Sequence, residues 1–355
     1  MKELKIKNIL SRWWKGILVT GVALLLCGGL INTLRAFLKP DEDVSLAAEQ
    51  VIIERAPVRD AVEPWADHFA LMALFSRVVY RADLDPAERR SRGCDYIHND
   101  DETTYGMPKS AAGRWIRWKG KNACYNEAGL YYETYVYNSA AGLLEEAVIA
   151  YRGTENWNVQ DVFYDWRANV SALLSLEASQ YSLAQSTLPA LIAGLKAKNP
   201  EIQIYTTGHS LGGGLAQQAI YAAKDIKRAY TFDPSPVTNW SKLRLDDKLQ
   251  QRDPVIYRAY HRKEALGYLR AITSRLNARR FGRSDYEFHF QESDAIESHN
   301  MAILACHFAA RIGRGGASHN YTRASAIEQI NDGRVCPADI QARLPLLNGS
   351  GASGE

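Results

Sequence analysis

The chain has 355 residues, 46% of them hydrophobic, which is enough to bury the core of one large α/β domain or two small ones. Its formal net charge of +3 comes from the N-terminal segment, because residues 1–40 contain seven Lys or Arg against one acidic residue. The other residues contain 36 basic and 39 acidic side chains, so the body lacks the basic surface typical of nucleic-acid binding. We therefore expect no nucleic acid partner.

Residues 1–40 are predicted to form a membrane anchor. Five basic residues precede an uncharged run of nineteen, residues 16–34, which as a helix would nearly span the roughly 30 Å hydrocarbon layer of a bilayer. The basic flank predicts a cytoplasmic N-terminus and an extracytoplasmic body, which in a bacterium means the periplasmic side. Two alternatives stay open: a cleaved signal peptide, although no small-x-small cleavage site follows, and a lipoprotein signal at Cys27, although Leu26 stands where a small residue is needed.

The body divides into a polar stalk, one folded domain and a tail. We assign residues 41–60 to the stalk, residues 61–347 to the domain and the Gly- and Ser-rich residues 348–355 to a disordered tail. Apolar residues at helical spacing predict a helix over residues 63–81. Residues 82–128 are charged and irregular, and we expect an exposed loop region there that could form a cap.

Four cysteines in the body fit an oxidising compartment. Cys94 and Cys124 are 30 residues apart, as are Cys306 and Cys336, and no spacing typical of a zinc site occurs. Of the three possible pairings we favour bridges 94–124 and 306–336, each contributing about 2–4 kcal/mol by restricting the unfolded chain. Four buried, reduced thiols are the alternative.

Strands and helices alternate in the rest of the domain. The predicted strands are 130–137, 147–151, 202–205, 229–232 and 255–260, and the predicted helices are 159–197, with a break near 171–179, and one that ends at Lys224. This alternation predicts an α/β fold with a mainly parallel sheet covered by helices on both faces.

A G-x-S-x-G motif marks Ser210 as the candidate nucleophile. Gly208 and Gly212 flank it between a predicted strand and a predicted helix, the context of a strained turn that exposes a serine hydroxyl. The N-terminus of that helix would supply backbone N–H groups and partial positive charge to an oxyanion. His209 is interpreted as structural, because on such a turn it points away from the serine hydroxyl.

Three blocks of the chain resemble the class 3 lipases, the fungal triacylglycerol lipase type. Residues 150–154 (AYRGT) are similar to a strand of the family that ends in R-G-[ST]. Residues 208–214 (GHSLGGG) are similar to the nucleophile elbow, the sharp turn that carries the catalytic serine. Residues 257–266 (YRAYHRKEAL) are similar to the strand before the catalytic acid. The elbow is the specific block, and the last is weak by itself. The resemblance covers about residues 65–310 and implies an α/β-hydrolase fold and a serine hydrolase.

The resemblance also implies an oxyanion hole. The backbone N–H groups of Leu211 and Thr154 would form it, together with the Thr154 hydroxyl. The alternative for the Arg-Gly-Thr block is an ordinary turn at the end of a strand. A stretch similar to D-W-x-x-N is expected to brace the oxyanion loop; its residues are Asp165, Trp166 and Asn169.

A serine hydrolase of this type needs a histidine and an acid beside the serine, which together form the catalytic triad. The acid has more than one candidate. Members of the family usually have Asp where this chain has Glu264, whose extra methylene would require a slightly shorter approach from the loop. Asp233 also ends a predicted strand and is the alternative acid, although its block usually forms the pocket wall. Other acids, such as Asp253, stay open as well.

The histidine must follow the acid in the chain, which leaves four candidates. His299 stands at the start of a predicted helix, on a loop from which it can reach the Ser210 hydroxyl. His319, in a Gly-rich loop, is the alternative. His289 lies in an alternating strand and His307 inside an apolar helix, so structural roles are expected for both.

The predicted protein is a serine hydrolase that cleaves carboxylic ester bonds of lipids through an acyl-enzyme, with no metal or organic cofactor. An anchor at residues 16–34 would hold it beside the lipid bilayer, which favours phospholipid or lysophospholipid over neutral glyceride. Two alternatives stay open. One is a thioesterase or small-ester carboxylesterase on the same fold, and the other is a catalytically silent lipid-binding module.

Overall fold

The computed structural model describes residues 51–53, 59–85, 87–89, 94–95, 105–110, 113–153, 166–235, 237, 254–264, 266–267, 283–291, 294–312 and 321–344. The predicted anchor, most of the stalk and the tail lie outside these residues. No helix in the described part of the chain has the length and hydrophobicity needed to cross a bilayer.

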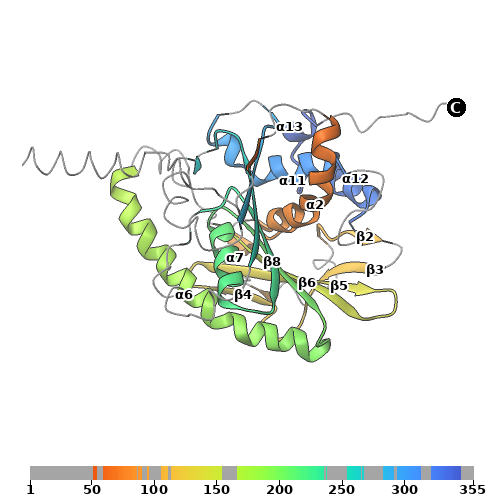
Figure 1. The fold of residues 1–355 in the computed structure, drawn as a ribbon, viewed down its shortest axis with the longest axis vertical. Coiled ribbons are helices and arrows are strands. Elements are labelled where there is room, and N and C mark those ends of the chain that lie inside the picture. Colours follow the sequence, from red (N-terminus) through yellow and green to blue (C-terminus); the bar gives the residue numbers. More distant parts are fainter. Residues whose placement is uncertain are drawn as a thin grey trace, which may run out of the picture. The chain divides into compact units, whose positions relative to one another are not determined.

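One sheet of ten strands organises the described residues (Figure 1). In sheet order the strands are β1 (Val51–Ile53), β10 (Arg283–Phe288), β9 (Val255–His261), β8 (Ile226–Phe232), β7 (Gln203–His209), β6 (Leu144–Tyr151), β5 (Leu130–Ser139), β3 (Gly113–Arg117) and β2 (Lys109–Ser110), and β4 (Cys124–Glu127) pairs with β5. Six neighbouring strands are parallel to one another: β1, β10, β9, β8, β7 and β6. The other strands, β5, β4, β3 and β2, pair in antiparallel fashion. The carboxyl ends of the parallel strands therefore share one edge, where open α/β sheets bind ligands.

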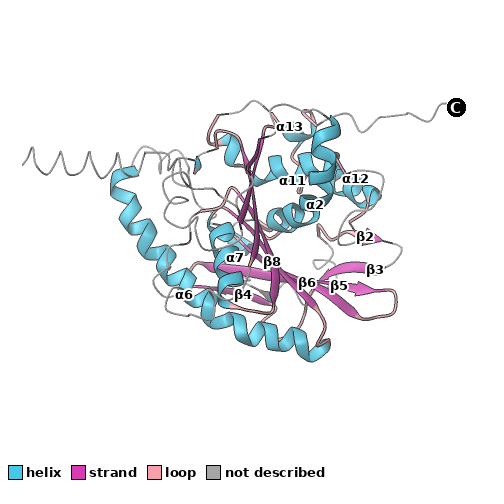
Figure 2. Cartoon of the chain, in the orientation of Figure 1, coloured by secondary structure: helices cyan, strands magenta, loops and turns pink. Residues whose placement is uncertain are grey.

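Helices cover both faces of this sheet (Figure 2). α2 (Arg59–Val78) and α11 (Met301–Ala310) pack together on one face, with α12 (Arg323–Asn331) and α13 (Ala338–Gln341) beside α11. α6 (Trp166–Lys198) and α7 (Leu211–Ala222) lie on the other face. Each face has its own hydrophobic core, and this double burial explains why β5 is buried along most of its length.

Alternation along β5 divides its side chains between the two cores. Tyr131 and Tyr135 enter the core with α2, whereas Tyr132 and Val136 enter the core with α6 and α7. The large aromatic content of this strand thus supplies packing surface to both layers. A strand with two buried faces has no polar alternation in its sequence, so its register is set by neighbouring strands and by the turn that follows it.

Several expectations from the sequence are confirmed. The sheet is mainly parallel, a helix covers most of residues 63–81, and both favoured disulfides form, Cys94–Cys124 and Cys306–Cys336. β1 lies within the range assigned to the stalk and pairs with β10.

Two local expectations are wrong. Residues 82–128 contain β2, β3 and β4 in addition to loops, and Trp115 and Arg117 of β3 are buried. The polar content of this segment misled the prediction because Arg117 forms a buried ion pair with Glu133 of β5. The break predicted near 171–179 is absent, since α6 continues through this stretch. A serine costs only a few tenths of a kcal/mol relative to alanine at a helical position, so the serines of this stretch do not end the helix.

Phe69 of α2 lies at the centre of one core. Its ring is 5.3 Å from Tyr286, 5.5 Å from Phe308 and 6.1 Å from Phe232, measured between ring centroids. These neighbours belong to the sheet and to α11, so Phe69 joins α2 to both. The side chain has no solvent exposure.

We predict that Phe69→Ala lowers the free energy of unfolding by about 3–5 kcal/mol, because the cavity it leaves is walled by fixed aromatic rings. Leu143→Ala is the control, since this side chain is 58% exposed before β6 and its loss should change stability by less than about 0.5 kcal/mol. Urea denaturation followed by circular dichroism measures both. Equal effects of the two substitutions would contradict the central role of Phe69.

Candidate active site

Ser210 lies at the sharp turn between β7 and α7. Its backbone has φ 56° and ψ −125°, a conformation that L-residues rarely adopt. A Cβ atom on Gly208 would stand 2.2 Å from the carbonyl oxygen of Gly212, and one on Gly212 would stand 2.2 Å from that of Tyr151. Both glycines of the motif are therefore required by close backbone contacts, within the turn and between the turn and β6.

The turn presents Ser210 at the N-terminus of α7. The amides of Gly213 and Gly214 donate to the Ser210 carbonyl oxygen at 3.0 and 3.2 Å, which closes the first turn of the helix on the serine. Leu211 is the first helical residue. No acidic side chain occurs in the first turn of α7, so nothing there offsets the partial positive charge of the helix end.

His299 connects Ser210 to Glu264. Its Nε2 is 3.0 Å from the Ser210 hydroxyl oxygen, and its Nδ1 is 2.7 Å from Oε2 of Glu264. Because a carboxylate only accepts hydrogen bonds, Nδ1 carries the proton and the unprotonated Nε2 accepts the serine hydroxyl. The three side chains form a continuous hydrogen-bonded chain in the polarity required to withdraw a proton from Ser210.

Local structure fixes both partners of the serine. Glu264 follows β9, is 3% exposed, and its Oε2 also accepts the Leu266 amide at 2.8 Å. His299 ends the 3₁₀ helix η2 (Glu297–His299), which directly precedes α11. Asp294 starts this turn by accepting the amide of Glu297 at 2.8 Å, and Asn300 caps α11. His299 thus lies between the turn held by Asp294 and the capped start of α11.

Asp233, the alternative acid, has a different set of partners. It follows β8 with φ 42°, is fully buried, and its Oδ1 accepts the His261 amide of β9 at 2.9 Å. Its Oδ2 lies 3.9 Å from Nε2 of His209. The structure therefore brings Glu264, and not Asp233, to the Nδ1 atom of His299, while Asp233 joins the ends of β8 and β9.

The remaining candidates are distributed as follows. Thr154, His319, Asp165 and Asp253 lie outside the described residues, as do the side chains of Trp166 and Asn169. His289 follows the end of β10, and His307 is buried in α11, where Arg311 and Gln291 contact its two ring nitrogens. Burial, followed by the charge of Arg311, lowers the pKa of His307 to about 3, so it stays neutral and structural.

Gly153 follows β6, where the predicted oxyanion loop begins, and lies against the turn at Ser210. A Cβ atom on Gly153 would stand 2.7 Å from the His209 carbonyl oxygen and 3.2 Å from Cβ of Ser210. The preceding Arg152 is fixed by its amide, which donates to the Tyr131 carbonyl oxygen at 3.0 Å. Glycine at position 153 is therefore required for the chain after β6 to pass against the turn at Ser210.

One group of side chains has the composition of a metal site. Among the described residues, His209, Asp233 and His299 place potential ligand atoms within 4.8 Å of one another. The ring nitrogens of His299 contact Ser210 and Glu264, and those of His209 contact Tyr80 and the His299 carbonyl oxygen. A metal ion could bind here only by displacing these hydrogen bonds, so we assign the group to the hydrogen-bonded site.

Tyr80, which lies in the turn after α2, is a residue of the site that no sequence signal predicted. Its hydroxyl oxygen is 2.9 Å from Nδ1 of His209, 129 positions along the chain. No motif links these two residues, so only the packing of α2 under the sheet reveals the contact.

Residues 72–243 match a phospholipase-like family described as the Tle-like phospholipase domain. The resemblance to lipases is therefore confirmed at the level of a lipase-like family. No curated protein matches the chain.

Solved lipase structures also overlap with the chain in part. The Lip2 lipase of Yarrowia lipolytica is 16% identical, with a TM-score of 0.33 over 61% of this chain and 76% of that chain. A deletion mutant of Rhizomucor miehei lipase in complex with its propeptide is 15% identical, with a TM-score of 0.35 over 58% and 62%. A lipase of Rhizopus microsporus var. chinensis is 16% identical, with a TM-score of 0.32 over 63% and 74%. The sheet order and the strand–turn–helix at Ser210 themselves fit an α/β-hydrolase fold.

The hydrogen bond between His299 and Glu264 predicts a proton NMR signal from the Nδ1–H group, downfield of the amide region. Glu264→Gln should remove this signal or move it upfield, because a neutral amide is a weaker acceptor than a carboxylate. Asp233→Asn is the control and should leave the signal in place. A signal that disappears in Asp233→Asn and persists in Glu264→Gln would assign the acid to Asp233.

Proposed function

We propose that the protein is a serine hydrolase that cleaves carboxylic ester bonds of lipids, with Ser210 as nucleophile, His299 as general base and Glu264 as the acid that orients it. The observation that carries the proposal is the hydrogen-bonded chain from Ser210 through His299 to Glu264. The similarity of residues 72–243 to a phospholipase-like family supports the choice of a lipid ester as substrate.

The first step is acyl transfer to the serine. His299 accepts the hydroxyl proton at Nε2 while the Ser210 oxygen attacks the ester carbonyl carbon. The resulting imidazolium then donates the same proton to the leaving alcohol. A water molecule repeats the sequence on the acyl-enzyme and releases the fatty acid and free Ser210, so that no proton or electron is left over.

The acid stabilises the imidazolium that forms in both steps. Glu264 is almost fully buried and lies 2.7 Å from Nδ1 of His299, so its negative charge is poorly screened by water. The Leu266 amide fixes the same carboxylate oxygen. This geometry holds one tautomer of His299 before substrate arrives, and such preorganisation is what triad acids contribute.

The N-terminus of α7 is suited to bind the negative oxygen of the tetrahedral intermediate. The Leu211 amide is one proposed donor, and the partial positive charge of the helix adds to it. The second proposed donor is Thr154. Its neighbour Gly153 stands against Ser210 Cβ, which supports a donor entering from the loop after β6. Each such donor contributes about 3–4 kcal/mol to the transition state.

We further propose that residues 1–40 anchor the enzyme, with the N-terminus in the cytoplasm, residues 16–34 across the bilayer and the hydrolase domain on the extracytoplasmic side. The two disulfides support an oxidising compartment for that domain. Tethering raises the local concentration of membrane lipids around Ser210, so phospholipid or lysophospholipid is the proposed substrate class and neutral glyceride the second.

Vesicles of phosphatidylglycerol and phosphatidylethanolamine should release fatty acid with the full-length protein, and Ser210→Ala should abolish the release. Glu264→Gln should lower kcat by roughly 10⁴-fold, because an amide favours the wrong tautomer of His299. Asp233→Asn is the comparison and should lower kcat far less. Gas chromatography of released fatty acids measures all four proteins.

Three outcomes would redirect this proposal. Hydrolysis of p-nitrophenyl butyrate without hydrolysis of vesicles would favour a small-ester carboxylesterase, and preferred turnover of acyl thioesters would favour a thioesterase. Vesicle binding by folded protein that hydrolyses none of these substrates would favour a lipid-binding module.

The anchor has a separate test. Full-length protein should float with vesicles after alkaline washing, whereas Leu24→Lys combined with Leu26→Lys should release it, because each lysine costs about 2.5–3.5 kcal/mol at the centre of a spanning helix. Ser210→Ala is the control and should float as the wild type does. Flotation of the double-lysine variant would exclude residues 16–34 as the anchor.

A further inference from the structure

His209, the residue before the candidate nucleophile, uses both nitrogens of its buried ring. Nε2 is 2.9 Å from the carbonyl oxygen of His299, and Nδ1 is 2.9 Å from the hydroxyl oxygen of Tyr80. A carbonyl oxygen only accepts, so Nε2 carries the proton of His209. Nδ1 is then an acceptor, and the Tyr80 hydroxyl donates to it. Tyr80 thereby fixes the tautomer that lets His209 hold His299.

This contact acts on the main chain of His299. The side chain of His299 is already directed toward Ser210 and Glu264, but its ring position depends on where the backbone of η2 lies. Within η2 the His299 amide donates to the Ile296 carbonyl oxygen at 3.1 Å. The bond from His209 fixes the carbonyl end of the same residue, so His299 is held at its amide, its carbonyl and both ring nitrogens.

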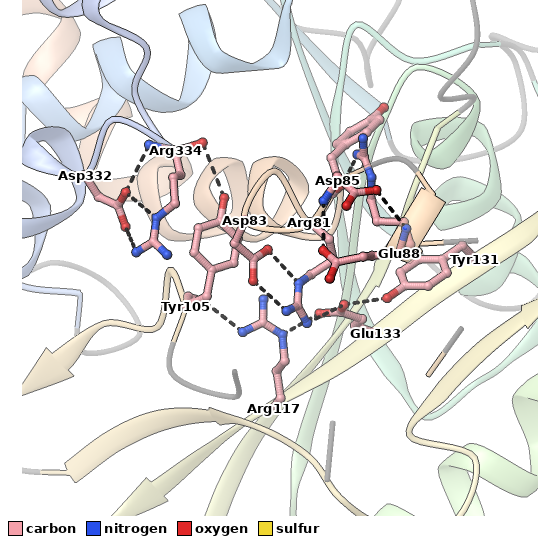
Figure 3. A network of polar contacts seen from close by, with 12 residues as sticks. Arg81, Asp83, Asp85, Glu88, Tyr105, Arg117, Tyr131, Glu133, Asp332 and Arg334 are labelled. Carbon is pink, nitrogen blue, oxygen red and sulfur yellow. Dashed lines mark hydrogen bonds and ion pairs between the residues drawn. The ribbon is translucent and has the colours of Figure 1, made fainter. Parts of the chain in front are cut away.

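Tyr80 belongs to a turn that is itself immobilised. The Arg89 guanidinium donates to the Tyr80 carbonyl oxygen at 2.7 Å. The next residue, Arg81, has φ 53° and is fully buried, with ion pairs to Asp83 at 2.6 Å and to Glu133 of β5 at 3.8 Å (Figure 3). The turn that carries the Tyr80 hydroxyl is thus joined to the antiparallel part of the sheet.

The same ionic network extends beyond the turn. Arg117 of β3 pairs with Glu133 at 2.7 Å, and the hydroxyl of Tyr131 donates to Glu133 at 2.6 Å. Arg117 also donates to the Tyr105 carbonyl oxygen at 2.7 Å, as Figure 3 shows. Buried charges tolerate little displacement, because loss of a partner leaves an unpaired charge in a low-dielectric environment. The position of Tyr80 is therefore set by rigid surroundings.

We propose that Tyr80 and His209 form a positioning pair that holds the main chain of His299, so that the general base stays within hydrogen-bond distance of the Ser210 hydroxyl. The inference rests on the proposed hydrolase function. His209 touches neither the substrate nor the transferred proton, and its action passes through His299.

The charge state of His209 suits this role. Burial, followed by the positive charge that His299 can carry, lowers the pKa of His209 well below its usual value. The other charged or titratable groups around it are Tyr80, Asp233, Glu264 and Arg77. A neutral His209 adds no positive charge beside His299, which must itself become an imidazolium during acyl transfer.

Two substitutions of His209 separate the contact with His299 from the contact with Tyr80. The amide nitrogen of a glutamine reaches the place of Nε2, so His209→Gln keeps a donor for the His299 carbonyl oxygen. The amide of an asparagine reaches only the place of Nδ1, so His209→Asn loses that donor. We expect His209→Asn to lower kcat by about 10–100-fold with little change in KM, and His209→Gln to recover most of the loss.

Tyr80→Phe tests the other end of the pair. It removes the donor to Nδ1 of His209. It should lower kcat by roughly 3–10-fold, which is the effect expected from the loss of one hydrogen bond. Tyr125→Phe is the matched control, because its hydroxyl bonds the exposed Glu127 on β4, and its kcat should equal that of the wild type. Steady-state hydrolysis of p-nitrophenyl butyrate by full-length protein gives kcat and KM, and urea denaturation of each variant gives stability.

A lower kcat in His209→Asn at unchanged unfolding midpoint, together with recovery in His209→Gln, supports the positioning pair. Equal kcat in the two His209 variants would overturn it. A loss of kcat that parallels a fall in the unfolding midpoint would overturn it as well. Absence of Ser210-dependent hydrolysis by the wild type would instead reject the proposed function. The two failures are therefore distinguishable.

Discussion

Close backbone contact at the turn between β7 and α7 is the constraint from which the site follows. The Ser210 main chain adopts a positive φ because β6, β7 and α7 converge there with no room for side chains at Gly208 or Gly212. The surrounding sheet and helices must over-determine such a conformation, since it is intrinsically unfavourable. Two hydrophobic cores, one on each face of the sheet, supply that rigidity.

Positive φ values recur at the same edge of the sheet. Ser210 follows β7, Asp233 follows β8 and Lys263 follows β9, each with a left-handed backbone. Hydrogen bonds link these ends laterally, as the Ser210 amide donates to the Phe232 carbonyl oxygen and the His261 amide donates to Asp233. The acid Glu264 emerges from the last of these turns. Ser210 and Glu264 thus follow the parallel strands β7 and β9, which lie on either side of β8, while His299 comes from the separate 3₁₀ turn before α11.

The sequence predicted the elements whose signal is local. The glycines around Ser210, the β-rich runs and the cysteine pairs are such signals. The structure contains the sharp turn at Ser210, the mainly parallel sheet and both favoured disulfides. The sequence favoured Glu264 but left Asp233 open as the acid, because both follow parallel strands and only their hydrogen-bond partners in the folded chain distinguish them. Polar residues also concealed β3, since the pairing of Arg117 with Glu133 depends on strands that are distant in the chain. The contact between Tyr80 and His209 escaped prediction for the same reason.

The most direct test of the account is covalent labelling of the folded, full-length protein by a fluorophosphonate, with the modified residue located by peptide mass spectrometry. The account predicts one label, on Ser210, and a labelling rate that falls by at least about a hundredfold in His299→Ala, because the general base is lost. Labelling of another serine, or an equal rate in His299→Ala, would contradict the claim that the chain from Ser210 through His299 to Glu264 activates the serine.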